Sequence, residues 1–148
     1  MNLTLRERAM RFLARREHAR SELARKLAPH AESAEELGAL LDDLSARRLL
    51  SDERYAEMRL HARGARFGDA RLAHELRQQG ISDELVTVAL AAGEDELVRA
   101  RQVWQKKFGA EPPELDAACR ARQTRFMLGR GFSGETIRRV LRGDFEDD

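Results

Sequence analysis

Basic side chains recur in three groups along the sequence, and arginine dominates each group. A guanidinium group donates paired hydrogen bonds to a phosphate or a carboxylate, and a row of such groups binds a polyanion in a sequence-independent, salt-sensitive way. We expect about half of these residues to be ordinary surface side chains that pair with nearby glutamates. The candidate binding residues are Arg15, Arg16, Arg20, Arg25 and Lys26, then Arg59, Arg63, Arg66, Arg71 and Arg77, and finally Arg120, Arg122, Arg125 and Arg130.

Patterns that indicate catalysis or metal binding are missing from the sequence. It has no glycine-rich phosphate loop, no Gly-x-Ser-x-Gly elbow and no carboxylate pair with acid–base spacing. The four histidines lack the i, i+4 spacing of a metal site, and the single cysteine, Cys119, has no partner for a disulfide or a zinc site. The acidic residues Asp52 and Glu53 are interpreted as the first turn of a helix, with Tyr55 in the core. We therefore predict a protein that is not an enzyme and has no catalytic residues, metal ion or cofactor.

Two other features are interpreted as core packing. Trp104 and Phe108 lie four residues apart, the spacing of neighbours on one helix face, which favours burial over base stacking. Cys119, next to Ala118 and near Leu115, is predicted to be a small buried residue.

The charge of the chain is balanced overall but segregated along its length. The 148 residues contain 27 Lys and Arg against 26 Asp and Glu, a net charge of +1. Residues 1–30 carry 8 basic and 3 acidic side chains, residues 31–53 carry 2 and 7, and residues 120–142 carry 7 and 1. Such alternation favours a repeated unit with differently charged faces and a charged partner.

The composition also limits the class of protein. No stretch is apolar enough to span a membrane, and arginines interrupt residues 1–16, so the sequence shows no signal peptide. We therefore expect a soluble, cytoplasmic protein, and because no long apolar heptad run is present we expect a monomer. Residues 144–148 are predicted to be a short acidic tail.

Helices are predicted throughout, because apolar residues recur at helical spacing and no period-2 run is sustained. Thr4 and Ser33 each precede a glutamate by three residues, the spacing of a capping box. Gly80 and Gly131 follow helical stretches and are predicted to end them in the left-handed conformation. Three further serines are predicted to be N-caps: Ser51, Ser82 and Ser133.

The helices repeat. Residues 79–84 (QGISDE) return as residues 130–135 (RGFSGE), and both contain a helix-ending glycine, an apolar residue and an N-cap serine. We predict an all-α fold of three tandem three-helix repeats, over residues 1–48, 49–92 and 93–143, in an elongated and curved array. An ordinary nine-helix globule is the alternative.

The order of several motifs resembles that of the bacterial RecX regulatory proteins. These motifs are residues 9–18 (AMRFLARREH), residues 50–56 (LSDERYA), residues 75–81 (ELRQQGI) and residues 126–133 (FMLGRGFS). The resemblance implies three tandem three-helix repeats and a non-enzymatic regulator of recombination, DNA repair and the SOS response. Its implied partner is the filament that the RecA recombinase forms on single-stranded DNA, with weak sequence-independent DNA contact. The chain departs from the family pattern at Ala19, where the usual serine would cap a helix.

The resemblance and the arginine groups together predict a function. We expect the array to lie in the groove of the RecA filament and to inhibit or modulate ATP turnover, strand exchange and filament stability. The alternative is a helix-turn-helix-like regulator that acts on duplex DNA, with Arg138 and Arg139 on a helix over residues 133–141. A scaffold without DNA contact is a third hypothesis.

Overall fold

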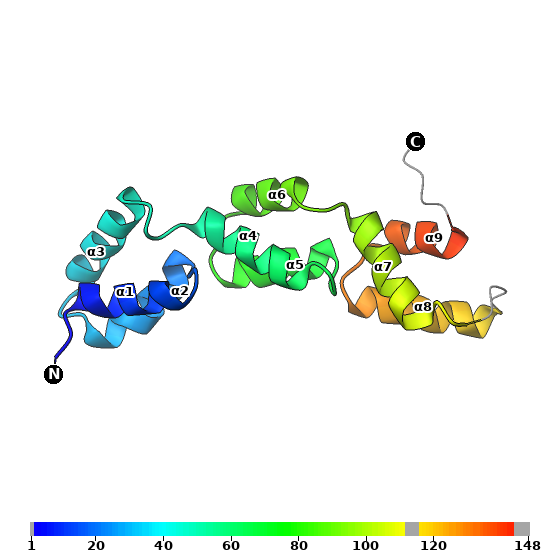
Figure 1. Ribbon diagram of the computed structural model, residues 1–148, viewed down its shortest axis with the longest axis horizontal. Coiled ribbons are helices and arrows are strands. Elements are labelled where there is room, and N and C mark those ends of the chain that lie inside the picture. Colours follow the sequence, from blue (N-terminus) through cyan, green and yellow to red (C-terminus); the bar gives the residue numbers. More distant parts are fainter. Residues whose placement is uncertain (1, 112–115, 144–148) are drawn as a thin grey trace. The chain divides into compact units, whose positions relative to one another are not determined.

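The structure is all-helical in the part of the chain that it describes. The computed structural model describes residues 2–111 and 116–143, and these ranges contain helices and no strand, which confirms the predicted all-α class (Figure 1). The elements are α1 (Leu5–Arg15), α2 (Arg20–Leu27), the 3-10 helix η1 (Ala28–His30), α3 (Ala34–Ala46), α4 (Asp52–Arg63), α5 (Asp69–Gln78), α6 (Asp83–Ala92), α7 (Glu96–Phe108), α8 (Ala117–Gly129) and α9 (Gly134–Arg142). The predicted acidic tail, residues 144–148, lies outside the described residues, as does Leu115.

Local capping explains where the helices begin. The hydroxyl oxygens of Thr4 and Ser33 accept hydrogen bonds from the backbone N–H groups of Glu7 and Glu36. Ser51, Ser82 and Ser133 accept in the same way from the N–H groups three residues further on. All five predicted N-caps are therefore confirmed, because each satisfies an N–H group that has no partner within its helix.

Left-handed residues explain where several helices end. Gly80 and Gly131 have φ values of 79° and 92°, as predicted. The following residues, Ile81 and Phe132, donate their N–H groups to the carbonyls of Leu76 and Met127 and complete the Schellman pattern. Arg48 ends α3 in the same conformation with a φ of 60°, although it is not a glycine. Because no glycine occupies this position, the left-handed conformation of Arg48 was not predicted from the sequence.

The described chain forms two compact units. The first unit contains Met1–Met58 and Leu76–Val86, and the second contains Arg59–Glu75 and Thr87–Asp148. The boundaries of the three repeats, at residues 48 and 92, stay a prediction.

The core of the first unit lies among its first three helices. Its buried residues are Ala9, Leu23, Leu27, Leu41, Leu44 and Leu50. Ala19, the residue before α2, offers no side-chain cap, but Asp52 Oδ1 accepts the N–H of Arg20 at 2.7 Å. The carboxylate at the start of α4 thus replaces the hydroxyl that Ala19 lacks. Tyr55 is buried as predicted.

The core of the second unit lies among α7, α8 and α9. Its buried residues are Leu97, Ala100, Met127, Phe132, Ile137 and Val140. Phe108 is buried, and Trp104 packs against this core while its Nε1–H donates to the buried Gln123 at 2.8 Å. The prediction that Trp104 and Phe108 are core residues is confirmed. The prediction that Cys119 is buried is wrong, because its side chain is half-buried and Ala118 beside it is exposed.

Candidate binding surface

Four of the predicted arginines meet around one phenylalanine ring in the second unit. The guanidinium carbons of Arg71, Arg63, Arg130 and Arg66 lie 4.2, 4.4, 5.2 and 5.4 Å from the centre of the Phe67 ring. Arg63 ends α4, Arg71 lies in α5, Arg66 lies between these helices, and Arg130 follows α8. Cations over an aromatic face are attracted by the ring quadrupole, so Phe67 keeps like charges together. We call these four arginines with Phe67, Arg59 and Glu75 the Phe67 cluster.

Glu75 is the carboxylate of the Phe67 cluster. Its two oxygens accept hydrogen bonds of 2.7 Å from Nε and Nη2 of Arg63, a bidentate arrangement. Arg71 and Arg59 lie 3.6 and 3.9 Å from the same carboxylate. The hydrogen bonds from Arg63 and the charges of Arg63, Arg59 and Arg71 lower the pKa of Glu75, although burial acts in the opposite direction. One negative charge therefore faces several positive charges, and the cluster keeps a large positive surplus.

A buried arginine, Arg99 in α7, holds the segment that carries Phe67. It is 7% exposed, and its Nε and Nη2 donate to the carbonyl oxygens of Gly64 and Phe67 at 2.9 and 2.8 Å. Its Nη1 donates to Asp69 Oδ1 at 2.7 Å and to the carbonyl of Glu94 at 3.1 Å. Because a buried guanidinium is stable only when its donors are used, this geometry fixes the backbone of residues 64–69.

The same segment packs directly against the turn after α8. The N–H of Gly68 donates to the carbonyl of Arg130 at 2.8 Å. A Cβ atom at Gly68 would collide with the carbonyl of Gly131, so the close approach requires glycine. Glu96, one turn before Arg99, accepts the N–H of Ser133 at 2.9 Å, and burial raises the pKa of Glu96. These contacts bring Arg130 to Phe67, from which it is distant in sequence.

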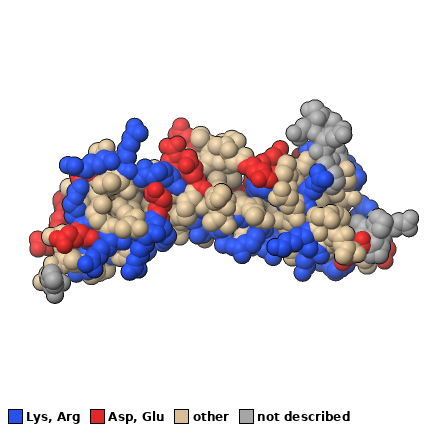
Figure 2. All heavy atoms as spheres, viewed as in Figure 1, with Lys and Arg blue, Asp and Glu red and all other residues tan. Residues whose placement is uncertain are grey.

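A row of cations and aromatic rings continues from the cluster along the second unit. Arg130 and Lys107 lie 5.1 and 5.3 Å from the centre of the Phe126 ring. Phe126 meets Phe108 edge to face, and Arg122 lies 5.7 Å from the Phe108 ring. Lys and Arg side chains gather along one edge of the face in Figure 2, over the segments labelled α5 and α8 in Figure 1. Phe67 and Phe108 are buried and Phe126 is half-buried with two cations beside it, so this surface presents mainly charge.

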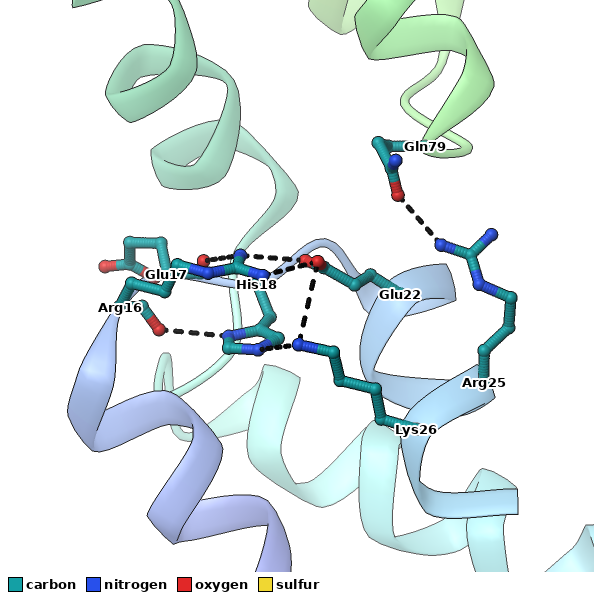
Figure 3. A network of polar contacts seen from close by, with 7 residues as sticks. All are labelled: Arg16, Glu17, His18, Glu22, Arg25, Lys26 and Gln79. Atoms are coloured by element: carbon teal, nitrogen blue, oxygen red, sulfur yellow. Dashed lines mark hydrogen bonds and ion pairs between the residues drawn. The ribbon is translucent and has the colours of Figure 1, made fainter. Parts of the chain in front are cut away.

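The basic residues of the first unit are arranged differently, with carboxylates close to most of them (Figure 3). Arg16 forms two hydrogen bonds with Glu22, at 3.0 and 2.6 Å, and Lys26 lies 3.9 Å from the same carboxylate. Burial raises the pKa of Glu22, but the hydrogen bond from Arg16 and the nearby positive charges outweigh it, so the pKa is lowered. One carboxylate therefore balances one of the two positive charges of this network.

His18 lies at the centre of that network and is 2% exposed. Its Nδ1 lies 3.1 Å from the carbonyl of Arg16 and its Nε2 lies 3.0 Å from Lys26 Nζ. An ammonium group only donates, so Nε2 accepts from Lys26 and Nδ1–H donates to the carbonyl, which requires a neutral ring. Burial lowers the pKa of His18, and the charges of Arg16 and Lys26 lower it further.

The remaining candidates are not brought together with the Phe67 cluster. Arg20 pairs with Asp42 at 2.7 Å, Arg77 pairs with Asp83 at 2.7 Å, and Arg25 donates to Gln79 Oε1 at 2.9 Å. Arg122 pairs with Glu111 at 2.8 Å. Three candidates are exposed and have no carboxylate partner among residues 2–111 and 116–143: Arg15, Arg120 and Arg125.

The sequence analysis did not predict that Phe67 and Glu75 belong to this surface, or that the buried Arg99 supports it. Arg99 lies between the apolar residues Leu97 and Ala100, and this position on the buried side of a helix is the one signal that the sequence offered. Within the described ranges, no group of three side chains is placed to hold a metal ion, and no helix is long and apolar enough to cross a membrane.

Comparisons with known proteins identify the family. The second three-helix domain of RecX matches residues 51–90, and the third three-helix domain of RecX matches residues 94–141. The protein named Regulatory protein RecX of Leptothrix cholodnii is 50% identical, over 99% of this chain and 93% of its own. The chain belongs to the RecX family. The RecX of Chromobacterium violaceum is 47% identical, over 98% of this chain and 93% of its own.

A solved RecX structure shows the same fold. The crystal structure of RecX from Lactobacillus salivarius has a TM-score of 0.83 and covers 95% of this chain and 94% of that chain, at 18% identity. At this identity the likeness supports the fold alone. The sequence resemblance to RecX is confirmed, together with the three-helix domains and a RecX regulatory role.

Proposed function

We propose that this RecX protein is a non-enzymatic regulator that binds the RecA filament on single-stranded DNA and inhibits its ATP turnover, strand exchange and stability. The observation that carries the proposed contact is the convergence of Arg63, Arg66, Arg71 and Arg130 on Phe67. Such a surplus of positive charge on one surface suits an acidic filament groove and the phosphates of the DNA inside it. In this proposal the protein acts as a monomer in the cytoplasm, where it meets RecA and DNA.

The arrangement of the cluster supports binding rather than catalysis. Its arginines are held by the Phe67 ring and by the segment that Arg99 fixes, so less side-chain entropy remains to be lost on binding. The arginines of the first unit offer less, because Arg16, Arg20 and Arg77 already have carboxylate partners. We therefore assign the main filament contact to the Phe67 cluster and a secondary one to the exposed Arg15.

The test is ATP turnover by RecA on single-stranded DNA, with the protein added after filaments have formed. Inhibition at well below one protein per RecA, unchanged when further DNA is supplied, supports direct action on the filament. No inhibition even in excess contradicts the proposal, whereas inhibition that extra DNA abolishes indicates competition for free DNA.

Two charge-reversal variants test which surface of the protein contacts the filament. Arg66→Glu changes an exposed residue that contacts the protein through the Phe67 ring, so the helices are expected to be retained. We expect Arg66→Glu to weaken inhibition roughly tenfold, a typical loss when a charge on a complementary surface is reversed. Arg138→Glu, the matched control, makes the same charge change on the exposed side of α9, whose Ile137 and Val140 are buried.

The same pair tests the alternative function. A helix-turn-helix-like regulator of duplex DNA would use α9, and Arg138→Glu would then be the more harmful variant. If Arg138→Glu impairs inhibition while Arg66→Glu leaves it intact, the Phe67 cluster is not the contact.

A further inference from the structure

Glu75 occupies the Phe67 cluster in the way that an anionic ligand would. Both oxygens of its carboxylate accept 2.7 Å hydrogen bonds from Arg63, and the guanidinium groups of Arg71 and Arg59 lie within 3.9 Å. A carboxylate and a phosphate both use two oxygens to fill the fork of an arginine. Glu75 therefore fills the place that an external anion would take at Arg63.

The arginines that bind Glu75 are also the arginines closest to Phe67. Arg63 and Arg71 lie 4.4 and 4.2 Å from the ring centre, nearer than Arg66 and Arg130. The side chains of Arg63 and Glu75 are each 22% exposed, so solvent and ligands reach the pair from outside. Because the pair is bidentate and two further arginines lie near the same carboxylate, an incoming anion separates it only by supplying two oxygens of its own to Arg63.

We propose that the Phe67 cluster binds the phosphodiester groups of a single nucleic-acid strand, and that Glu75 is an internal ligand which an incoming phosphate displaces from Arg63. This inference rests on the proposed function because it concerns the same surface. It adds the class of ligand and names Glu75 as the group that limits the affinity for that ligand. In the free protein the carboxylate withholds part of the charge of Arg59, Arg63 and Arg71. Binding then requires an anion that outcompetes one carboxylate.

The form of the surface favours a nucleic-acid strand over an acidic peptide. The cations continue from Phe67 through Arg130 to Lys107 at Phe126, which forms a row of positive charges, and the row ends at Arg122, which is paired with Glu111. A strand presents one phosphate per nucleotide at regular spacing, and each phosphate oxygen accepts from more than one donor. Phe67 and Phe108 are buried, so bases cannot stack on these two rings. The row is therefore expected to contact phosphates and not to distinguish between bases.

The test uses Glu75→Gln and a fluorescently labelled oligothymidylate, without RecA. The amide keeps the size of the side chain and removes the charge that competes for Arg63. We expect binding to become roughly three- to tenfold tighter, and its dependence on salt to steepen by about one released ion, because one more arginine becomes available to phosphate. The matched control is Glu135→Gln, the same charge change at an exposed residue of α9.

Equal tightening in both variants would show a general effect of net charge and overturn the proposal, as would no tightening with Glu75→Gln. Binding of poly-glutamate in preference to oligothymidylate would overturn the assignment of the ligand. In the unaltered protein, NMR of the Arg63 Nε–H gives a second test that needs no variant. Saturation with oligothymidylate should shift this signal, and an unshifted signal contradicts displacement of Glu75.

These outcomes separate the inference from the proposed function. Tighter oligonucleotide binding by Glu75→Gln with no inhibition of RecA by either protein supports the ligand assignment and contradicts the filament proposal. Inhibition of RecA that Glu75→Gln leaves unchanged, with unchanged oligonucleotide binding, contradicts only the role of Glu75.

Discussion

The two units use the same residue type in opposite ways. In the first unit, Arg16, Arg20 and Arg77 each pair with a different carboxylate within 2.7 Å. In the second unit, Arg59, Arg63 and Arg71 share Glu75, and Arg66 and Arg130 contact a ring instead. Charge is therefore largely cancelled in one unit and concentrated in the other.

The scaffolds beneath these charges differ as well. In the first unit the buried group, His18, is a neutral ring that accepts a hydrogen bond from Lys26. In the second unit the buried group is itself charged, and Arg99 uses its donors on backbone carbonyls and Asp69. Arginine content along the sequence thus says little about where positive charge stays unneutralised. What decides is whether carboxylates lie within reach after folding.

The largest expected effect comes from removing the scaffold of the second unit with Arg99→Met. The carbonyls of Gly64 and Phe67 would lose buried donors, so we expect the free energy of unfolding to fall by about 3 kcal/mol. Denaturant-induced unfolding followed by circular dichroism measures the change. Arg138→Met, at an exposed position, should stay within about 0.5 kcal/mol of the unaltered protein. Equal midpoints for the two variants would show that the Phe67 segment does not depend on Arg99.

A smaller effect is expected at the end of α3 in the first unit. Arg48 has a φ of 60°, a conformation that glycine adopts without steric cost. Arg48→Gly should therefore raise the free energy of unfolding by about 0.5–1 kcal/mol, measured by thermal or chemical unfolding. Arg48→Ala removes the same side chain but retains a Cβ atom, so it should bring no such gain. Stabilisation by both variants would assign the effect to the side chain instead of the backbone.

The smallest effect is expected from pH, through His18. Its pKa is lowered in the folded protein, so the unfolded chain takes up a proton first, and stability falls as pH decreases through the ordinary value of 6.5. The melting temperature should drop by no more than a few degrees between neutral pH and about pH 5.5, and His18→Gln should reduce that drop. The lowered pKa values of Glu22 and Glu75 place their titration below 4.5, outside this window.

His18→Gln has to be compared directly with the unaltered protein, because stability also depends on pH through Glu96. Its raised pKa acts with the opposite sign, because the folded protein then binds a proton more readily than the unfolded chain does. The difference between the two curves isolates His18. Parallel curves would mean that the histidine titrates alike in the folded and unfolded states.

Structural features that depend on hydrogen bonds between residues close in sequence could be predicted from the sequence. Ser133 caps α9 and Gly131 ends α8 because each satisfies backbone groups three to five residues away. The burial of Phe108 followed from its helical spacing to Trp104, and the burial of Tyr55 from its place in the first turn of a helix. The half-burial of Cys119 was not predicted, because its neighbours in sequence do not determine which side of α8 the protein covers.

The sequence by itself determined the all-helical class, the caps, the glycine stops and the motifs that resemble RecX, because these depend on local hydrogen bonding and periodicity. The tertiary structure decided which arginines are neutralised. Arg130 lies next to Phe67 because Gly68 contacts the turn after α8. The buried Arg99 holds the backbone of the segment that carries Phe67. Charge pairing falls off over a few ångströms. Distances between residues remote in sequence, which only the fold sets, therefore separate a positively charged surface from a neutral one.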